Sequence, residues 1–197
     1  FKVTPSLLEK HINSKTKLMI FSSPCNPTGS VYTKDELAEL ATVIKKNPSF
    51  YVISDEIYEL IQFGGKHESL AQFDEVYDQV VTINGVSKGF AMTGWRLGYI
   101  GAPLWIAKAC DKIQSQFTSG TSTISQMAAL EAIAQPPSKV HYMLEAFTKR
   151  RSLMIERLKA IPRLEVNEPE GAFYMFPKVS GFFGKRFNGT EIKDSND

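Results

Sequence analysis

Polar and charged side chains collect just outside the short apolar runs of this 197-residue sequence. The residues with the most useful chemistry in these places are Asn26, Asp55, Tyr58, Ser87, Lys88 and Arg96. A lysine amine can attack a carbonyl to form a Schiff base. An aspartate can keep a ring nitrogen protonated, and a serine with an arginine can hold a phosphate. Because an amide and a phenol can also hydrogen-bond a ring hydroxyl, the set suits a polar, phosphorylated, ring-containing ligand.

The apolar runs are predicted strands of one sheet, at residues 17–22, 50–53, 80–84 and 97–101. A helix is predicted between the first two strands. Thr33 and Glu36 form a capping box at its start, and Pro48 ends it. A strand, an amphipathic helix and a strand within about 40 residues form a βαβ unit with parallel strands. Since ligands of open α/β sheets bind beyond the carboxyl ends of the strands, we expect the six side chains to meet there.

The remainder of the chain is predicted to contain both helices and strands. Helices are expected at residues 105–117 and 124–133, with a long helix from residue 140 to just before Pro162. Residues 164–166 and 172–176 are strand-like. The Pro136-Pro137 pair is the predicted domain boundary. Residues 1–135 would belong to an α/β domain, and residues 136–197 would supply a connecting helix and the start of a small α+β domain.

Composition narrows the possible functions. The formal net charge is +2, and no basic excess exists to neutralise phosphates, which argues against nucleic acid as a partner. No run approaches the roughly 18 apolar residues of a membrane span, and no signal peptide opens the sequence, so we expect a cytoplasmic protein without a membrane partner. The three histidines are far apart and lack ligand spacing, so no metal is expected. The chain starts at Phe1 without Met, and we expect it to be part of a longer protein.

Three motifs carry a resemblance to a known family. They are Asn26-Pro-Thr-Gly29, Ser54-Asp-Glu-Ile-Tyr58 and Ser87-Lys-Gly-Phe-Ala-Met-Thr-Gly-Trp-Arg-Leu-Gly-Tyr99. In this order, each at a strand end, they resemble class I aminotransferases of pyridoxal-phosphate fold type I, and the bacterial aspartate aminotransferase branch most closely. The resemblance implies a three-layer α/β/α large domain with a mostly parallel sheet. It also implies pyridoxal 5'-phosphate as cofactor.

The resemblance also implies a role for each candidate residue. Lys88 would bind the cofactor covalently and then shuttle a proton at the substrate α-carbon. Asp55 would pair with the pyridine nitrogen, while Asn26 and Tyr58 would hydrogen-bond the ring oxygen. The phosphate would be bound by Ser87 and Arg96. Lys88, Asp55 and Tyr58 are thus the predicted catalytic residues, and Glu56, beside Asp55, receives no role.

The same resemblance implies an aminotransferase that moves an amino group from aspartate, or another amino acid, to a 2-oxo acid such as 2-oxoglutarate. A homodimer is expected of the full-length protein. Family members carry further cofactor-binding and substrate-binding residues outside this stretch, so we expect the chain by itself to be inactive. Two alternatives stay open. One is a pyridoxal-phosphate lyase on the same fold, and the other is the non-catalytic aminotransferase-like sensor domain of a transcription regulator.

Overall fold

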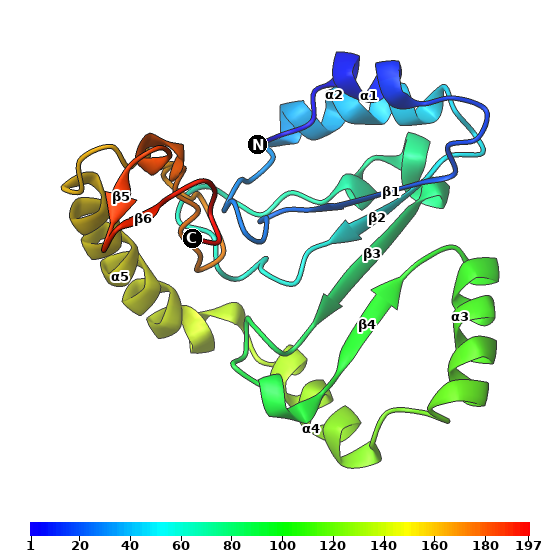
Figure 1. Cartoon of the computed structure of the whole chain (residues 1–197). Coiled ribbons are helices and arrows are strands. Elements are labelled where there is room, and N and C mark those ends of the chain that lie inside the picture. Colours follow the sequence, from blue (N-terminus) through cyan, green and yellow to red (C-terminus); the bar gives the residue numbers. More distant parts are fainter.

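A computed structural model describes all 197 residues (Figure 1). The helices are α1 (Pro5–His11), α2 (Lys34–Lys45), α3 (Leu104–Phe117), α4 (Thr123–Ala134) and α5 (His141–Lys159). The strands are β1 (Leu18–Ser22), β2 (Tyr51–Asp55), β3 (Val80–Gly85), β4 (Gly98–Gly101), β5 (Arg186–Phe187) and β6 (Thr190–Glu191). Short 3₁₀ turns lie at Leu70–Gln72, Asp74–Gln79, Thr93–Trp95, Pro137–Val140 and Ser180–Phe182. The first four strands and the longer helices agree with the predicted ranges to within two residues.

The main sheet has the order β1-β2-β3-β4. β1 pairs with β2 and β2 pairs with β3 in parallel, whereas β4 runs antiparallel to β3. The prediction of an α/β fold with a mostly parallel sheet is therefore confirmed. Because β1, β2 and β3 point the same way, their carboxyl ends lie at one edge, and that edge also receives the start of the antiparallel β4.

Helices lie on both sides of this sheet. Helices α1 and α2 cover one face (Figure 1). There Leu37, Leu40 and Ile44 pack with Val52 of β2 in one core, and each of these four side chains is at most 1% exposed. On the other side, α3 brings the Trp105 ring to 5.6 Å from the Tyr51 ring at the start of β2. This arrangement agrees with the three-layer α/β/α large domain that the resemblance implies.

The predicted capping box starts α2. The Thr33 hydroxyl accepts from the Glu36 amide at 3.2 Å, and the Glu36 carboxylate accepts from the Thr33 amide at 2.7 Å. These two bonds satisfy backbone donors that a helix start otherwise leaves without partners. The helix therefore begins at a fixed residue, and its apolar stripe faces the sheet in a fixed register.

Two predicted strands in the C-terminal part are wrong. Residues 164–166 make only a single bridge, from Glu165 to Lys178, and residues 172–176 make none. The other isolated bridge, from Gln62 to Gly171, lies just before the second segment. Their neighbouring backbone groups bond loops of the α/β part instead, as when the Glu170 and Gly171 amides donate to the Gly29 carbonyl at 2.8 and 3.0 Å. The segment is thus held by tertiary contacts, and the only strands beyond α5 are the short β5 and β6.

Several large apolar side chains of the sheet and its helices are exposed. Phe117 of α3 is 87% exposed, Ile124 of α4 is 74% exposed and Ile20 of β1 is 69% exposed. β4 is exposed along its whole length. No helix in the structure has both the length and the apolar character needed to cross a membrane.

Candidate functional site

The predicted site residues lie at one edge of the main sheet: Asn26, Asp55, Tyr58, Ser87, Lys88 and Arg96. The first three follow or end the parallel strands β1 and β2. The other three belong to the connection between β3 and β4. Gly85, the last residue of β3, pairs with Gly98, the first residue of β4, so this connection starts and finishes at the same edge. The strand order alone therefore explains why residues 70 positions apart come together.

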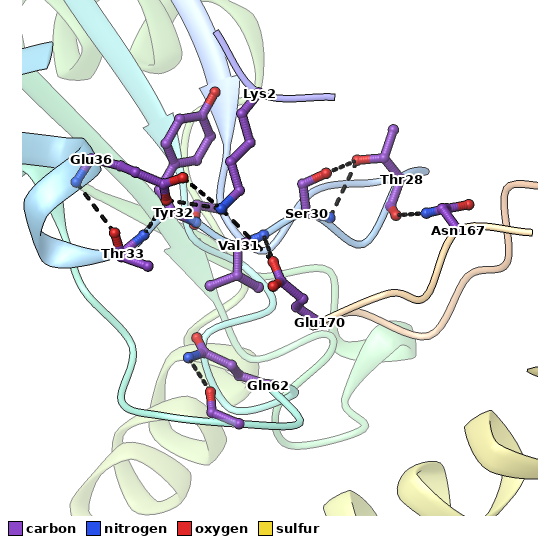
Figure 2. Close-up of polar contacts among 12 residues, drawn as sticks. Lys2, Thr28, Ser30, Val31, Tyr32, Thr33, Glu36, Gln62, Asn167 and Glu170 are labelled. Atoms are coloured by element: carbon purple, nitrogen blue, oxygen red, sulfur yellow. Dashed lines mark hydrogen bonds and ion pairs between the residues drawn. The ribbon is translucent and has the colours of Figure 1, made fainter. Parts of the chain in front are cut away.

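The loop that carries Asn26 is fixed by the C-terminal part of the chain. Figure 2 shows the Asn167 amide donating to the Thr28 carbonyl at 2.7 Å and the Glu170 carboxylate accepting from the Val31 amide at 3.3 Å. Gly29 has a left-handed φ of 70°, and a Cβ there would come within 2.2 Å of Pro169. Only glycine meets both conditions, because it adopts positive φ without penalty and has no side chain to clash.

Asp55 and Tyr58 are held by the end of β2 and the turn after it. The Asp55 carboxylate accepts from the Ile57 amide at 3.1 Å, and the Asp55 carbonyl accepts from the Ser23 amide at 3.1 Å. Tyr58 is 3% exposed. Burial raises the pKa of the Tyr58 phenol above its usual range, and the hydrogen bond with Tyr174 and the negative charge of Asp55 raise this pKa further. Tyr58 is therefore a neutral hydrogen-bond donor at physiological pH.

Two aromatic residues that the sequence analysis gave no role join the site. The Tyr174 and Tyr58 hydroxyls are 2.6 Å apart, and the Asn26 amide donates to the Tyr174 hydroxyl at 3.4 Å. The Lys88 ammonium lies 5.8 Å from the centre of the Phe173 ring and 6.0 Å from that of Tyr58. The sequence analysis predicts only a strand for residues 172–176, and the tertiary structure shows that the Phe173 and Tyr174 rings reach Lys88 and Tyr58.

The connection from β3 to β4 carries three side chains that can donate hydrogen bonds, those of Ser87, Lys88 and Arg96. Ser87 and Lys88 are half-buried, and Arg96 is exposed and donates one N–H to the Thr93 carbonyl at 2.9 Å. Arg96 has the left-handed backbone φ 51°, ψ 51°, which is uncommon outside glycine. Gly89 lies so close to Leu60 that a Cβ would approach it to 2.8 Å. This close approach lets the Lys88 turn lie against the loop that carries Tyr58.

Comparison with known proteins identifies the family. The family model described as aminotransferase class I and II matches residues 1–184. The chain belongs to this family. It is 42% identical to an aspartate aminotransferase of Pinus pinaster, over 98% of the chain and 39% of that protein. It is 43% identical to an aspartate/prephenate aminotransferase of Cereibacter sphaeroides, over 98% of the chain and 49% of that protein.

Solved structures agree. The chain superimposes on the aspartate aminotransferase from Rhizobium meliloti with a TM-score of 0.94 and 37% identity, covering 99% of this chain and 50% of that one. An aspartate aminotransferase from Thermus thermophilus with maleate gives a TM-score of 0.85 at 39% identity. The predicted resemblance is thus confirmed. The chain spans about half the length of these relatives, or less.

Aminotransferases of this family depend on pyridoxal phosphate, which confirms the predicted cofactor. The donor set at the sheet edge fits this group. Lys88 supplies an amine for a carbonyl, while Ser87 and Arg96 supply donors suited to a phosphate. Asp55 supplies a carboxylate for a ring nitrogen. No cluster of three or more His, Cys, Asp or Glu side chains that could hold a metal ion occurs in the chain.

Proposed function

We propose that this chain is the cofactor-binding and proton-transferring part of an aminotransferase. The reaction would move an amino group from aspartate, or from another amino acid, to a 2-oxo acid such as 2-oxoglutarate. The observation that carries the proposal is the meeting of Asp55, Tyr58 and Lys88 at one sheet edge in a chain of the aminotransferase family. The names of its relatives, which include aspartate and aspartate/prephenate aminotransferases, support aspartate as the amino donor.

Each proposed role follows from the chemistry of the side chain. Pyridoxal phosphate supplies an aldehyde that takes up the amino group and a ring that withdraws electrons. Lys88 holds the cofactor through its amine and, once released, moves a proton at the substrate α-carbon. Asp55 keeps the ring nitrogen protonated, since an opposite charge within a few ångströms favours the charged form by about 1–3 pKa units.

The remaining residues of the site bind the cofactor and orient its ring. Tyr58 and Asn26 donate hydrogen bonds to the ring oxygen, and their positions beside Tyr174 support this role. Ser87 and Arg96 bind the phosphate, and the planar guanidinium of Arg96 can contact two oxygens. The Phe173 and Tyr58 rings exclude water from one side of Lys88. A drier environment strengthens the electrostatic contacts of its amine.

We further propose that residues 1–135 belong to the large domain and residues 136–197 to the small domain. The break between α4 and α5 at Pro136-Pro137 supports this boundary. A cytoplasmic homodimer with a role in amino-acid biosynthesis is the setting that we propose for the full-length protein. The large exposed side chains of α3 and α4 support burial of this surface in the complete protein.

The proposal is tested with the full-length protein that contains this chain. Incubation with pyridoxal phosphate, aspartate and 2-oxoglutarate is expected to yield oxaloacetate and glutamate in equal amounts. Release of ammonia together with a 2-oxo acid, independent of 2-oxoglutarate, would identify a lyase instead. Bound cofactor without turnover of any amino acid would contradict the catalytic proposal and favour a sensor domain.

A further inference from the structure

A buried carboxylate lies directly behind the candidate site. Glu56 follows Asp55 in the sequence, its side chain is only 5% exposed, and none of the proposed roles uses it. In β2 the residues Val52 and Ser54 are buried, while Asp55 belongs to the alternate set. Successive side chains of a strand point to opposite faces. A hydrogen bond of 2.9 Å from the Ser54 hydroxyl to Glu56 Oε1 shows that Glu56 shares the buried face.

All the bonds of this carboxylate are to side chains of the same buried region. Oε1 accepts from the Ser54 and Ser69 hydroxyls at 2.9 and 2.7 Å, and Oε2 lies 2.9 Å from Nε2 of His67. An ionised carboxylate only accepts hydrogen bonds, so each of these groups donates to it. The Glu56 amide donates to the Ile83 carbonyl of β3 at 2.9 Å. The residue is therefore fixed through both its backbone and its side chain.

These bonds close the loop that carries Tyr58. Residues 57–66 leave the sheet after Glu56 and return at His67, which the Glu56 carboxylate holds. The middle of the loop is held separately, because the Ala172 amide donates to the Ile61 carbonyl and the Phe63 amide donates to the Glu170 carbonyl, both at 2.8 Å. Joining the two ends of a loop removes conformations that it could otherwise adopt. Glu56 thus lies where it can set the direction of Asp55 on one side and of Tyr58 on the other.

We propose that Glu56, His67 and Ser69 form a positioning cluster that fixes Asp55 and Tyr58 for the cofactor. The inference rests on the proposed function, since it gives these two residues their target. A buried carboxylate needs hydrogen-bond donors around it, and buried donors need an acceptor. In a Glu56→Gln variant the amide oxygen still accepts from the two hydroxyls, but an amide N–H replaces the acceptor of the His67 Nε2–H. The bond that holds the returning end of the loop is then lost. The ends of the loop then separate, and both Asp55 and Tyr58 move relative to the ring that they bind.

The test compares Glu56→Gln with Glu68→Gln in the full-length protein. Glu68 lies between His67 and Ser69 but outside the cluster, so it is a matched control for charge and position. In the cofactor-free protein, we expect faster hydrogen exchange of residues 54–62 in Glu56→Gln only. In the loaded protein, we expect kcat to fall about tenfold or more with KM changed less than about threefold. A hydrogen bond from Tyr58 favours the ionised ring oxygen, so we expect the absorbance of the bound cofactor to titrate at higher pH in Tyr58→Phe. In Glu56→Gln, which displaces Tyr58 without removing it, we expect a shift in the same direction but less far.

Histidine variants separate positioning from simple loss of bulk. His67→Gln keeps a nitrogen donor near the place of Nε2, whereas His67→Ala removes it. We expect His67→Gln to restore most of the wild-type titration and kcat, and His67→Ala to behave like Glu56→Gln. If Glu56→Gln does not fold, the two variants His67→Gln and His67→Ala, together with Ser69→Ala, are compared in the same measurements.

The experiment distinguishes failure of the positioning cluster from failure of the proposed function. If the wild-type protein binds pyridoxal phosphate and transaminates, while Glu56→Gln matches it in hydrogen exchange, in titration and in kcat within about twofold, the positioning cluster is wrong and the proposed function stands. Equal behaviour of His67→Gln and His67→Ala, both near wild type, contradicts the cluster in the same way. If the wild-type protein neither binds the cofactor nor transaminates, both proposals fall.

Discussion

The two sides of the candidate site are built differently. On the β2 side, the Asp55 carboxylate and the Tyr58 hydroxyl already have hydrogen-bond partners within the chain, namely the Ile57 amide and the Tyr174 hydroxyl. On the β3–β4 side, the Lys88 ammonium contacts only aromatic rings, and Arg96 uses one N–H on a neighbouring carbonyl. The chain therefore fixes the groups proposed for the ring by its own bonds and leaves the cationic donors for a ligand.

This difference predicts two kinds of variant. Substitutions on the β3–β4 side are expected to change binding of the cofactor and turnover without changing stability, because these side chains stabilise little else. Substitutions on the β2 side are expected to change turnover and stability together. Each prediction below concerns the full-length protein unless stated otherwise.

The largest effect is expected for Lys88→Ala. Proton transfer by a positioned side chain contributes about 10²–10⁴-fold, and the covalent attachment is lost as well, so turnover should fall by about 10⁴-fold or more. Transamination assays measure this loss, and Lys112→Ala on α3 is the control. A melting temperature within about 2 °C of wild type is expected, since about 1 kcal/mol corresponds to several degrees. Substantial turnover of Lys88→Ala would contradict its proposed role.

Asp55→Ala is expected to have the next largest effect. Loss of the charge lowers the ring nitrogen pKa by about 1–3 units, and each unit corresponds to roughly 1.4 kcal/mol or tenfold in rate. Turnover should therefore fall by about 10- to 1,000-fold, and Asp55→Glu should retain more activity than Asp55→Ala. Kinetics under saturating cofactor separate this loss from weaker binding. Near-normal turnover of Asp55→Ala would rule out control of the ring nitrogen.

The β2 side also shows what the sequence could and could not predict. The strand itself follows from a continuous apolar run, and α2 follows from the Thr33–Glu36 capping box, because both signals are local. The place of Asp55 follows from the strand order, since parallel strands end at one edge. The role of residues 172–174 could not be predicted in this way. Their alternation resembles a strand, but Ala172 adopts a left-handed φ of 58° and bonds the Ile61 carbonyl.

The sequence analysis did not predict the short helix α1, the left-handed backbone of Arg96 or the burial of Glu56, for a related reason. Helix α1 has only seven residues, although Thr4 caps it and Pro5 opens it. It is stabilised by packing of Leu8 into the core beside α2, which no local pattern reveals. The left-handed backbone of Arg96 depends on the turn between β3 and β4, and the burial of Glu56 depends on His67 and Ser69 folding over it. The packing of α1 and the burial of Glu56 therefore arise from contacts between residues that are separated in the sequence.

A moderate effect is expected for Arg96→Ala. The variant removes the charged donor proposed for the phosphate, so the dissociation constant for pyridoxal phosphate should rise about 10- to 100-fold, since 1.4 kcal/mol is tenfold. Saturation with cofactor should restore most of the turnover. Arg157→Ala, an exposed residue of α5, is the control. Unchanged cofactor affinity in an otherwise folded Arg96→Ala would place the phosphate elsewhere.

The smallest effect concerns pH and the cofactor-free chain. The pKa of Tyr58 is raised by burial, so the folded state resists ionisation that the unfolded state undergoes near pH 10. The stability that this group contributes is therefore fully present below about pH 10 and is lost as pH rises above it. Denaturant unfolding at increasing pH should show a shallower loss for Tyr58→Phe than for wild type. Equal slopes for the two proteins would contradict the burial argument.

Covalent trapping tests the central claim most directly, namely that the amine beside Tyr58 and Phe173 holds the cofactor. The loaded full-length protein is reduced with borohydride and digested, and the peptides are mapped by mass spectrometry. The account predicts a pyridoxyl adduct on Lys88, with none in Lys88→Ala under the same conditions. An adduct on any other lysine, formed equally in both proteins, would contradict it.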